Sequence, residues 1–295
     1  MINYSFIIPY HNGNNYLKRL LDSIPLRDDI EVIIVDDNSD ADKHAYTDRT
    51  DVHIIRIGKE ESKGAGRARN YGIVSAKGKW LLFADCDDKY EVNFIEKLDK
   101  FIDSDSDIIY FGVFLMFNPK TKTYKKNTKY EYYLKKFVRN KNSMFWMKSV
   151  KHSLQVPWNF MIRREYVINI NAKFAETPTC NDAYFHHFTA MNTQKVDAII
   201  DRIYYWIDNP GSLTKIMRTP EQIKATKEQG KLMLTMRIEA GAWNTIPGYF
   251  ENIGKSIKDY GIIYSIKKYT RRAFNGIPWH IIYWHKLLDS VNWNK

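Results

Sequence analysis

Acidic and polar side chains follow several apolar segments of the chain, at the point where each segment ends. Pro9-Tyr10-His11-Asn12 follows the first segment, Asp36-Asp37 the second and Asp85-Cys86-Asp87-Asp88 the fourth, and a glycine-rich stretch spans Lys63–Asn70. Carboxylates packed together repel each other and raise each other's pKa unless a positive charge neutralises them. Mg²⁺ or Mn²⁺ bound to phosphates supplies that charge, because hard cations prefer oxygen ligands.

An Asp-x-Asp pattern alone is weak support for a metal site, since the chain repeats it at Asp40–Asp42 and Asp103–Asp107. Asp103–Asp107 precedes its apolar segment, which is typical of a solvated turn. Asp85–Asp88 directly follows Trp80–Ala84, a segment typical of a buried strand. These aspartates could instead cap a helix at its N-terminus or lie in its first turn, where Asp is also favoured.

The elements that must position these side chains alternate in type over residues 1–117. The expected strands are Tyr4–Pro9, Glu31–Val35, His53–Ile57, Trp80–Ala84 and Ile108–Phe117, and the expected helices are Asn14–Ser23, Gly66–Ala76 and Asn93–Ile102. This alternation predicts a parallel sheet covered on both faces. Ligands of such sheets bind beyond the carboxyl ends of the strands, where the acidic loops are expected.

The remainder of the chain is less regular. Val156–Arg163 and Ile203–Ile207 are strand-like, and Asp182–Met191 is helix-like. Thr219–Ala242 is expected to be a helix with Pro220 in its first turn.

Length and composition narrow the class of protein. The 295 residues include only two cysteines, and a net charge of +11 calls for an anionic partner. The start of the chain lacks a basic region and cleavage site, and the longest apolar run, Ile108–Phe117, is too short to span a membrane. A reduced, cytoplasmic protein, peripheral on the inner face of the cell membrane at most, is expected.

The segments IIPYHN, EVIIVDDNSD and KGAGRARNYGI..AKGKWLLFADCDD, in this order and spacing, resemble the nucleotide-sugar half of family-2 glycosyltransferases with a GT-A fold. The resemblance covers residues 3–117 closely. A weaker continuation, PWNFMIRREYV followed by NDAYFHHF, resembles the acceptor-side segment of that family. The fold implied is α/β, a GT-A Rossmann-like, mainly parallel sheet covered by helices. It would comprise a nucleotide-sugar half (1–117), an acceptor half (118–215) and a mostly helical, basic extension (216–295).

The resemblance also implies roles for the residues of these motifs. Asp37 would bond the pyrimidine edge of the donor's base, with Asp36 beside it. Asp87 would be the principal ligand of Mn²⁺ or Mg²⁺, with Asp85 near the metal or the ribose. The full set of expected donor-binding residues is Pro9, Tyr10, Asn12, Asp36, Asp37, Gly64, Arg67, Asn70, Asp85, Asp87 and Asp88. Their structural alternatives are turn caps, tight turns and a solvated helix face, the last for Arg67 and Arg69.

Inverting transfer also needs a base that takes the proton from the acceptor hydroxyl. The resemblance assigns this role to Asp182, and Asn181 stands where the family usually has Glu. The alternative for Asp182 is a helix N-cap. Trp158, Asn159 and Asn181 are expected on the acceptor side, and His186 is a further candidate metal ligand. A core Trp and a packed His are the competing interpretations.

Two segments are strongly basic. Residues 118–152 hold eleven Lys or Arg and one acidic residue, interleaved with aromatic residues. Such interleaving also occurs in single-stranded nucleic-acid binding proteins, but the motifs of those proteins are missing, so no nucleic acid is expected. The segment 249–295 is basic and aromatic, as in helices that lie on anionic membranes, although a solvated helix packed on its domain explains it too.

The sequence therefore predicts a metal-dependent, inverting glycosyltransferase with a UDP-sugar as donor. Its acceptor would be a glycan or a polyprenyl-diphosphate-linked glycan of surface polysaccharide, capsule or lipopolysaccharide assembly. Two alternatives stay open at this point. One is a sugar-nucleotide nucleotidyltransferase, and the other is a basic module that binds nucleic acid or a membrane surface.

Overall fold

The computed structural model describes residues 1–62, 64–126, 128–209, 219–242 and 245. They belong to two compact units, residues 1–216 and residues 217–295. Within the described part of the chain, no helix combines the length and apolarity that a membrane span requires. The basic segment 249–295 lies outside the described residues.

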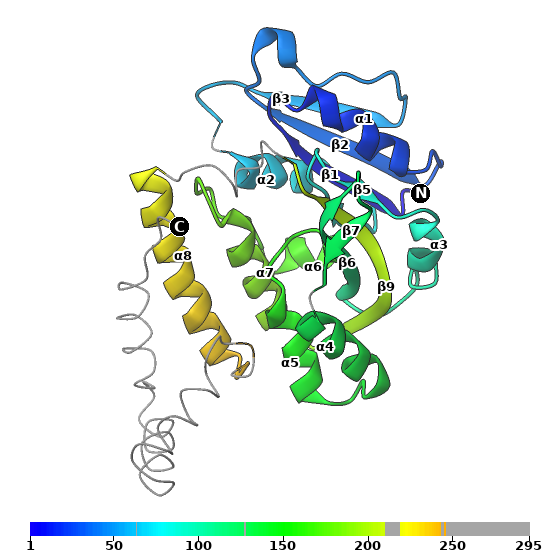
Figure 1. Cartoon of the computed structure of the whole chain (residues 1–295), viewed down its shortest axis with the longest axis vertical. Coiled ribbons are helices and arrows are strands. Elements are labelled where there is room, and N and C mark those ends of the chain that lie inside the picture. The colour runs from blue at the N-terminus through cyan, green and yellow to red at the C-terminus, as the bar shows by residue number, and fades with distance from the viewer. Residues whose placement is uncertain (63, 127, 210–218, 243–244, 246–295) are drawn as a thin grey trace, which may run out of the picture. The chain divides into compact units, whose positions relative to one another are not determined.

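The first unit is built on one twisted sheet (Figure 1). Its strands are β1 (Tyr4–Tyr10), β2 (Ile30–Asp37), β3 (Val52–Ile57), β4 (Trp80–Phe83), β5 (Lys89–Tyr90), β6 (Ile108–Asn118), β7 (Thr123–Lys125), β8 (Phe160–Arg163) and β9 (Val196–Ile207). Their order across the sheet is β3-β2-β1-β4-β8-β6-β9-β5, and β7 pairs with β6.

The predicted parallel sheet holds for the first four strands, and the sheet becomes mixed beyond them. β1 pairs in parallel with β2 and β4, and β2 with β3. β8 then runs antiparallel to both β4 and β6, while β6 and β9 are parallel. The carboxyl ends of β1, β2 and β4 therefore meet at one edge of the sheet, where the acidic loops begin.

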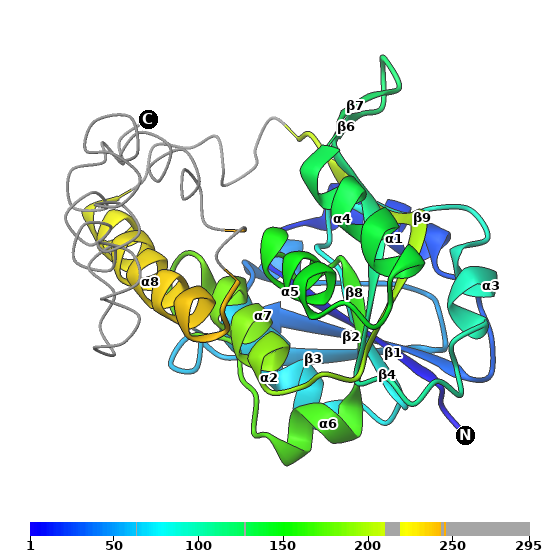
Figure 2. The ribbon, with the colours of Figure 1, turned by 90° about the horizontal axis from the view of Figure 1, so that it is seen from below.

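Helices cover both faces of this sheet (Figures 1 and 2). Their bounds in the first unit are α1 (Asn14–Ser23), α2 (Ala65–Ser75), α3 (Phe94–Asp99), α4 (Thr128–Arg139), α5 (Met144–Ser153), α6 (Arg164–Asn169) and α7 (Asn181–Met191), with a 3₁₀ turn at Ala41–Lys43. Phe6 and Ile8 of β1 pack with α1 and α3, whereas Ile7 between them packs with α2 and the remaining helices. Burial on both faces explains why these strands are almost continuously apolar.

The second unit contains the predicted helix as α8 (Pro220–Glu239). Thr219 caps it, because its Oγ1 accepts from the Gln222 amide (3.2 Å) while Gln222 Oε1 accepts from the Thr219 amide (2.9 Å). This reciprocal capping box, together with Pro220 in the first turn, sets where the helix begins.

Helix α2 lies so close to β1 that one of its positions has no room for a side chain. A Cβ atom on Gly72 would lie 2.3 Å from Cγ2 of Ile7, a stiff, buried and β-branched residue. This close approach places the first turn of α2 against the ends of β1 and β2.

We expect Gly72→Ala to lower the free energy of unfolding by about 2 kcal/mol, since the clash outweighs the roughly 1 kcal/mol that Ala gains in a helix. Gly58→Ala is the control, because a Cβ there meets nothing within 4 Å. Thermal melting of the two variants measures the difference, and Ile7→Ala combined with Gly72→Ala should cost less than the sum of the two single changes, because the clash disappears with the Ile7 side chain. A Gly72→Ala protein that melts at or above the wild-type temperature would contradict this packing.

Candidate active site

Asp36 and Asp37 end β2 but face different surroundings. The Asp36 carboxylate accepts hydrogen bonds from the Ser39 amide (3.1 Å) and from the Ala45 amide and His44 Nδ1 (3.0 Å each). Burial acts to raise the pKa of Asp36, but these hydrogen bonds together lower it. Asp36 therefore anchors its loop, as the turn-cap alternative predicted, and its donor-binding role stays a prediction.

Asp37 is held by one oxygen and leaves the other available. Its Oδ2 accepts from the Gly64 amide (2.8 Å), and its Oδ1 is buried without a hydrogen-bond partner among the described residues. Gly64 adopts a φ of +80°, a conformation that favours glycine. A buried acceptor without a donor is costly, so this oxygen is suited to a ligand N–H.

The loop after β1 is hydrogen-bonded to the loop after β2. Tyr10 is buried and its hydroxyl donates to the Lys43 carbonyl (2.9 Å), while Pro9 lies within the buried β1 strand. Asn12 accepts from the Asp40 amide (3.0 Å) and donates to its carboxylate (3.2 Å). Tyr10 and Asn12 thus hold the loop, and their expected contacts with a donor stay predictions.

Asp88 is likewise structural. It is fully buried, where its Oδ2 accepts from the Tyr204 hydroxyl (2.7 Å) and its Oδ1 accepts from the Ile207 amide (2.7 Å). Burial, and then the charges of Asp85 and Asp87, raise its pKa. Asp88 joins the acidic loop to β9, and the position near the donor sugar that the resemblance implied for it stays a prediction.

Asp85 and Asp87 remain as the half-buried carboxylates of this loop. Asp85 Oδ1 accepts from Arg69 Nη2 (2.6 Å), and Asp87 Oδ2 accepts from Asn209 Nδ2 (3.0 Å). Burial, followed by the charge of Asp85, raises the pKa of Asp87. Two such carboxylates suit a hard divalent cation whose other ligands come from phosphates. The described residues hold no group of three or more His, Cys, Asp or Glu arranged for a metal.

Arg69 joins this loop to the segment that carries Asp182. Besides its contact with Asp85, its Nη1 donates to Asn181 Oδ1 (2.8 Å), and its guanidinium lies 5.3 Å from the centre of the Phe174 ring. Arg69 is buried, so the solvated helix face considered for it is wrong. Its partners lie far away in the sequence, which is why spacing did not identify it.

Arg67 differs from Arg69, although it is only two residues away. It forms an ion pair with Glu176 (2.9 Å), and 29% of its side chain is exposed against 5% for Arg69. Its expected approach to the nucleotide would therefore have to compete with Glu176.

Asp182 lies in the first turn of α7, after Cys180 and Asn181. Cys180, in a left-handed conformation (φ +56°), occupies the N-cap position, so the N-cap alternative for Asp182 is wrong. Burial raises the pKa of Asp182, the charge of Arg69 opposes that shift and the charge of Asp85 adds to it. Asp182 thus shares its electrostatic environment with Arg69 and Asp85.

Four further residues of the predicted site have structural partners. Asn70 exchanges two hydrogen bonds with the backbone of Phe174 (2.8 and 3.1 Å) and ties α2 to that loop. Trp158 is buried and stacks on Tyr204, with ring centres 5.2 Å apart.

Asn159 and His186 are core residues. Asn159 is fully buried and donates to the Tyr130 hydroxyl (3.1 Å). His186 Nε2 lies 2.7 Å from the Lys151 carbonyl, and its ring packs near Tyr110 and Phe160. The surroundings of His186 correspond to the packed His considered for it, and the acceptor-side role of Asn159 stays a prediction.

The chain matches a known protein family. The family model described as "Glycosyl transferase family 2" matches residues 5–170. An uncharacterized glycosyltransferase of Rickettsia bellii is 34% identical over 44% of this chain. The poly(ribitol-phosphate) beta-N-acetylglucosaminyltransferase TarS of Staphylococcus aureus is 29% identical over 35% of it. The chain spans about a fifth of the length of either relative.

A solved structure has the same fold. The crystal structure of S. aureus TarS residues 1–349 in complex with UDP-GlcNAc aligns with a TM-score of 0.62 at 19% identity. The alignment covers 84% of this chain and 72% of that one.

We expect Arg69→Met to lower the free energy of unfolding by about 2 kcal/mol, because it removes charged hydrogen bonds to the half-buried Asp85 and Asn181. Arg67→Met removes an equal charge from a pair that solvent screens, so it should destabilise the protein far less than Arg69→Met. Thermal melting of both variants measures the difference. Equal melting temperatures would show that Arg69 does not organise the site.

Proposed function

The chain belongs to glycosyltransferase family 2, and from that premise we propose that it transfers a sugar from a UDP-sugar to a hydroxyl of a glycan acceptor. The observation that carries the proposal is the placement of Asp37 at the end of β2 and of Asp85 and Asp87 after β4, with Arg69 linking Asp85 to the turn of α7 that holds Asp182. The match to the family favours this function over a nucleotidyltransferase or a binding module.

Donor recognition would begin at Asp37. Its buried, unpartnered Oδ1 is suited to accept a hydrogen bond from the N3–H of uracil, while the Gly64 amide keeps the carboxylate oriented. Guanine and thymine also carry ring N–H groups, so the preference for uracil depends further on the shape of the surrounding loops. The UDP-GlcNAc complex of TarS supports a UDP-sugar by analogy of fold.

Asp85 and Asp87 would hold Mn²⁺ or Mg²⁺. A cation at that position supplies positive charge to the diphosphate that leaves. The raised pKa of Asp87 supports this assignment, because a bound cation would relieve the burial and repulsion that raise it. Arg69 would neutralise Asp85 from the protein side and hold Asn181, and with it the first turn of α7.

Asp182 would act as the general base. Its carboxylate takes the proton of the acceptor hydroxyl as the acceptor oxygen bonds to the anomeric carbon. The bond from that carbon to the phosphate oxygen breaks, and its electron pair leaves with UDP. A single displacement of this kind inverts the anomeric centre.

For the acceptor, we propose a glycan of a surface polymer, either free or linked to a polyprenyl diphosphate. The similarity to TarS and to the minor teichoic acid biosynthesis protein GgaA of Bacillus subtilis supports a polymer of the cell surface. The net charge of +11 suits a phosphate-bearing acceptor.

The test is turnover of a panel of UDP-, GDP- and dTDP-sugars with Mn²⁺. Asp182→Asn should lower kcat by at least about 100-fold and leave UDP affinity unchanged, because only the proton transfer is lost. In the wild type, kcat should fall as the pH drops, with a midpoint above the ordinary Asp pKa of about 3.9, because burial raises the pKa of Asp182.

Asp105→Asn is the matched control, because Asp105 is exposed and precedes β6 at the opposite edge of the sheet. Full turnover by Asp182→Asn would exclude Asp182 as the base. An absence of turnover with every donor in the panel would count against the transferase proposal itself.

A further inference from the structure

Helices α4 and α5 present aromatic and apolar side chains to solvent. The α4–α5 aromatic patch consists of Tyr132, Lys136, Met144, Phe145 and Trp146. The exposed fractions are 49% for Tyr132, 44% for Met144 and 50% for Phe145. The Trp146 ring joins them, with its centre 5.7 Å from that of Tyr132 and 4.7 Å from that of Phe145. Figure 2 shows the two helices as neighbours.

A lysine lies within this patch. The Lys136 ammonium is 5.4 Å from the centre of the Tyr132 ring and 5.9 Å from that of Trp146. A cation held over aromatic rings keeps its charge close to the apolar surface. The patch is therefore both apolar and positively charged.

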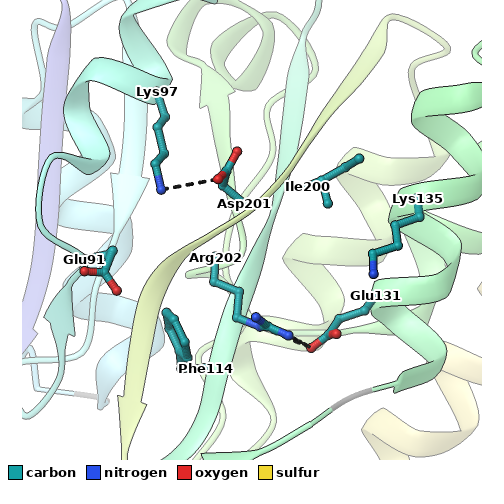
Figure 3. Close-up of a pocket in the computed structure, with 8 residues that line it drawn as sticks. All are labelled: Glu91, Lys97, Phe114, Glu131, Lys135, Ile200, Asp201 and Arg202. Atoms are coloured by element: carbon teal, nitrogen blue, oxygen red, sulfur yellow. Dashed lines mark hydrogen bonds and ion pairs between the residues drawn. The ribbon is translucent and has the colours of Figure 1, made fainter.

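The acidic residue of this basic segment does not offset that charge. Residues 118–152 contain eleven Lys or Arg, and Glu131 is their one acidic residue. Glu131 accepts a hydrogen bond from Arg202 of β9 (2.8 Å). Glu131 and Lys135 line a pocket of about 420 Å³ with Arg202 (Figure 3). Tyr132 and Lys136, each one residue further along α4, belong to the aromatic patch instead.

We propose that the α4–α5 aromatic patch docks on an anionic phospholipid surface. Exposed Tyr and Trp rings beside Lys suit the boundary between headgroups and acyl chains, where rings insert and ammonium groups meet lipid phosphates. Met144 and Phe145 favour a membrane over a hydrated polyanion such as polyphosphate, because polyphosphate offers neither side chain an apolar partner. The proposal is independent of the transferase function and of the segment 249–295.

The test is sedimentation of the full chain with vesicles of phosphatidylcholine alone or with about a third phosphatidylglycerol. We expect binding to the anionic vesicles that weakens as salt is added. Phe145→Ser combined with Lys136→Glu should lower the partition coefficient at least about tenfold. Phe145→Trp should bind the anionic vesicles at least as tightly as the wild type, because it keeps an aromatic side chain at this position.

Val74→Ser combined with Lys77→Glu is the matched control, since it removes one exposed apolar and one exposed basic side chain at the end of α2. Binding of the patch variant at the wild-type level, or equal losses in patch and control variants, would overturn the proposal. A third result would also overturn the proposal: soluble polyphosphate abolishes vesicle binding while Phe145→Ser alone has no effect. The patch would then be a surface for hydrated anions.

Discussion

The candidate site depends on one buried cation. The Arg69 guanidinium binds Asp85 at the end of β4 and Asn181 at the start of α7, so it connects residues 16 and 112 positions away in the chain. A buried charge must be paired, and this requirement fixes the acidic loop and the first turn of α7 relative to α2. The site also depends on the close approach of the first turn of α2 to the loop that precedes α7. A Cβ on Gly66 would lie 2.1 Å from the Ala175 carbonyl oxygen in that loop.

Burial and hydrogen bonding divide the aspartates of the site into two classes. Asp36 and Asp88 have both oxygens committed to neighbouring loops and strands, and they shape the edge of the sheet. Among the described residues, Asp37 keeps a buried oxygen without a partner, and burial raises the pKa values of Asp87 and Asp182. An aspartate thus holds the edge of the sheet in one position and leaves a carboxylate oxygen available to a ligand in the next, according to the atoms around it.

Much of the first half of the fold was predictable from sequence, because buried parallel strands leave apolar runs that alternate with amphipathic helices. The helices α4 and α5 were not predicted, although Tyr130, Leu134 and Phe137 follow helical spacing within the run of lysines. Asp85, Asp87 and Asp182 lie where their motifs indicated. The burial of Trp158, Asn159 and His186 was not predictable, because sequence shows neither the direction of a side chain nor its partner. Arg69 was missed because both of its partners are distant in the sequence.

The central claim is that the acidic edge of the sheet binds the nucleotide of the donor together with a divalent cation. Calorimetric titration of the protein with UDP, in Mn²⁺ and in EDTA, tests it most directly. We expect binding that depends on Mn²⁺ and weakens at least about tenfold in Asp37→Asn, because an amide N–H would then oppose the N–H of the base. The melting temperature of the variant should stay unchanged. No binding of UDP in either buffer, or equal affinity in Asp37→Asn, would contradict the account.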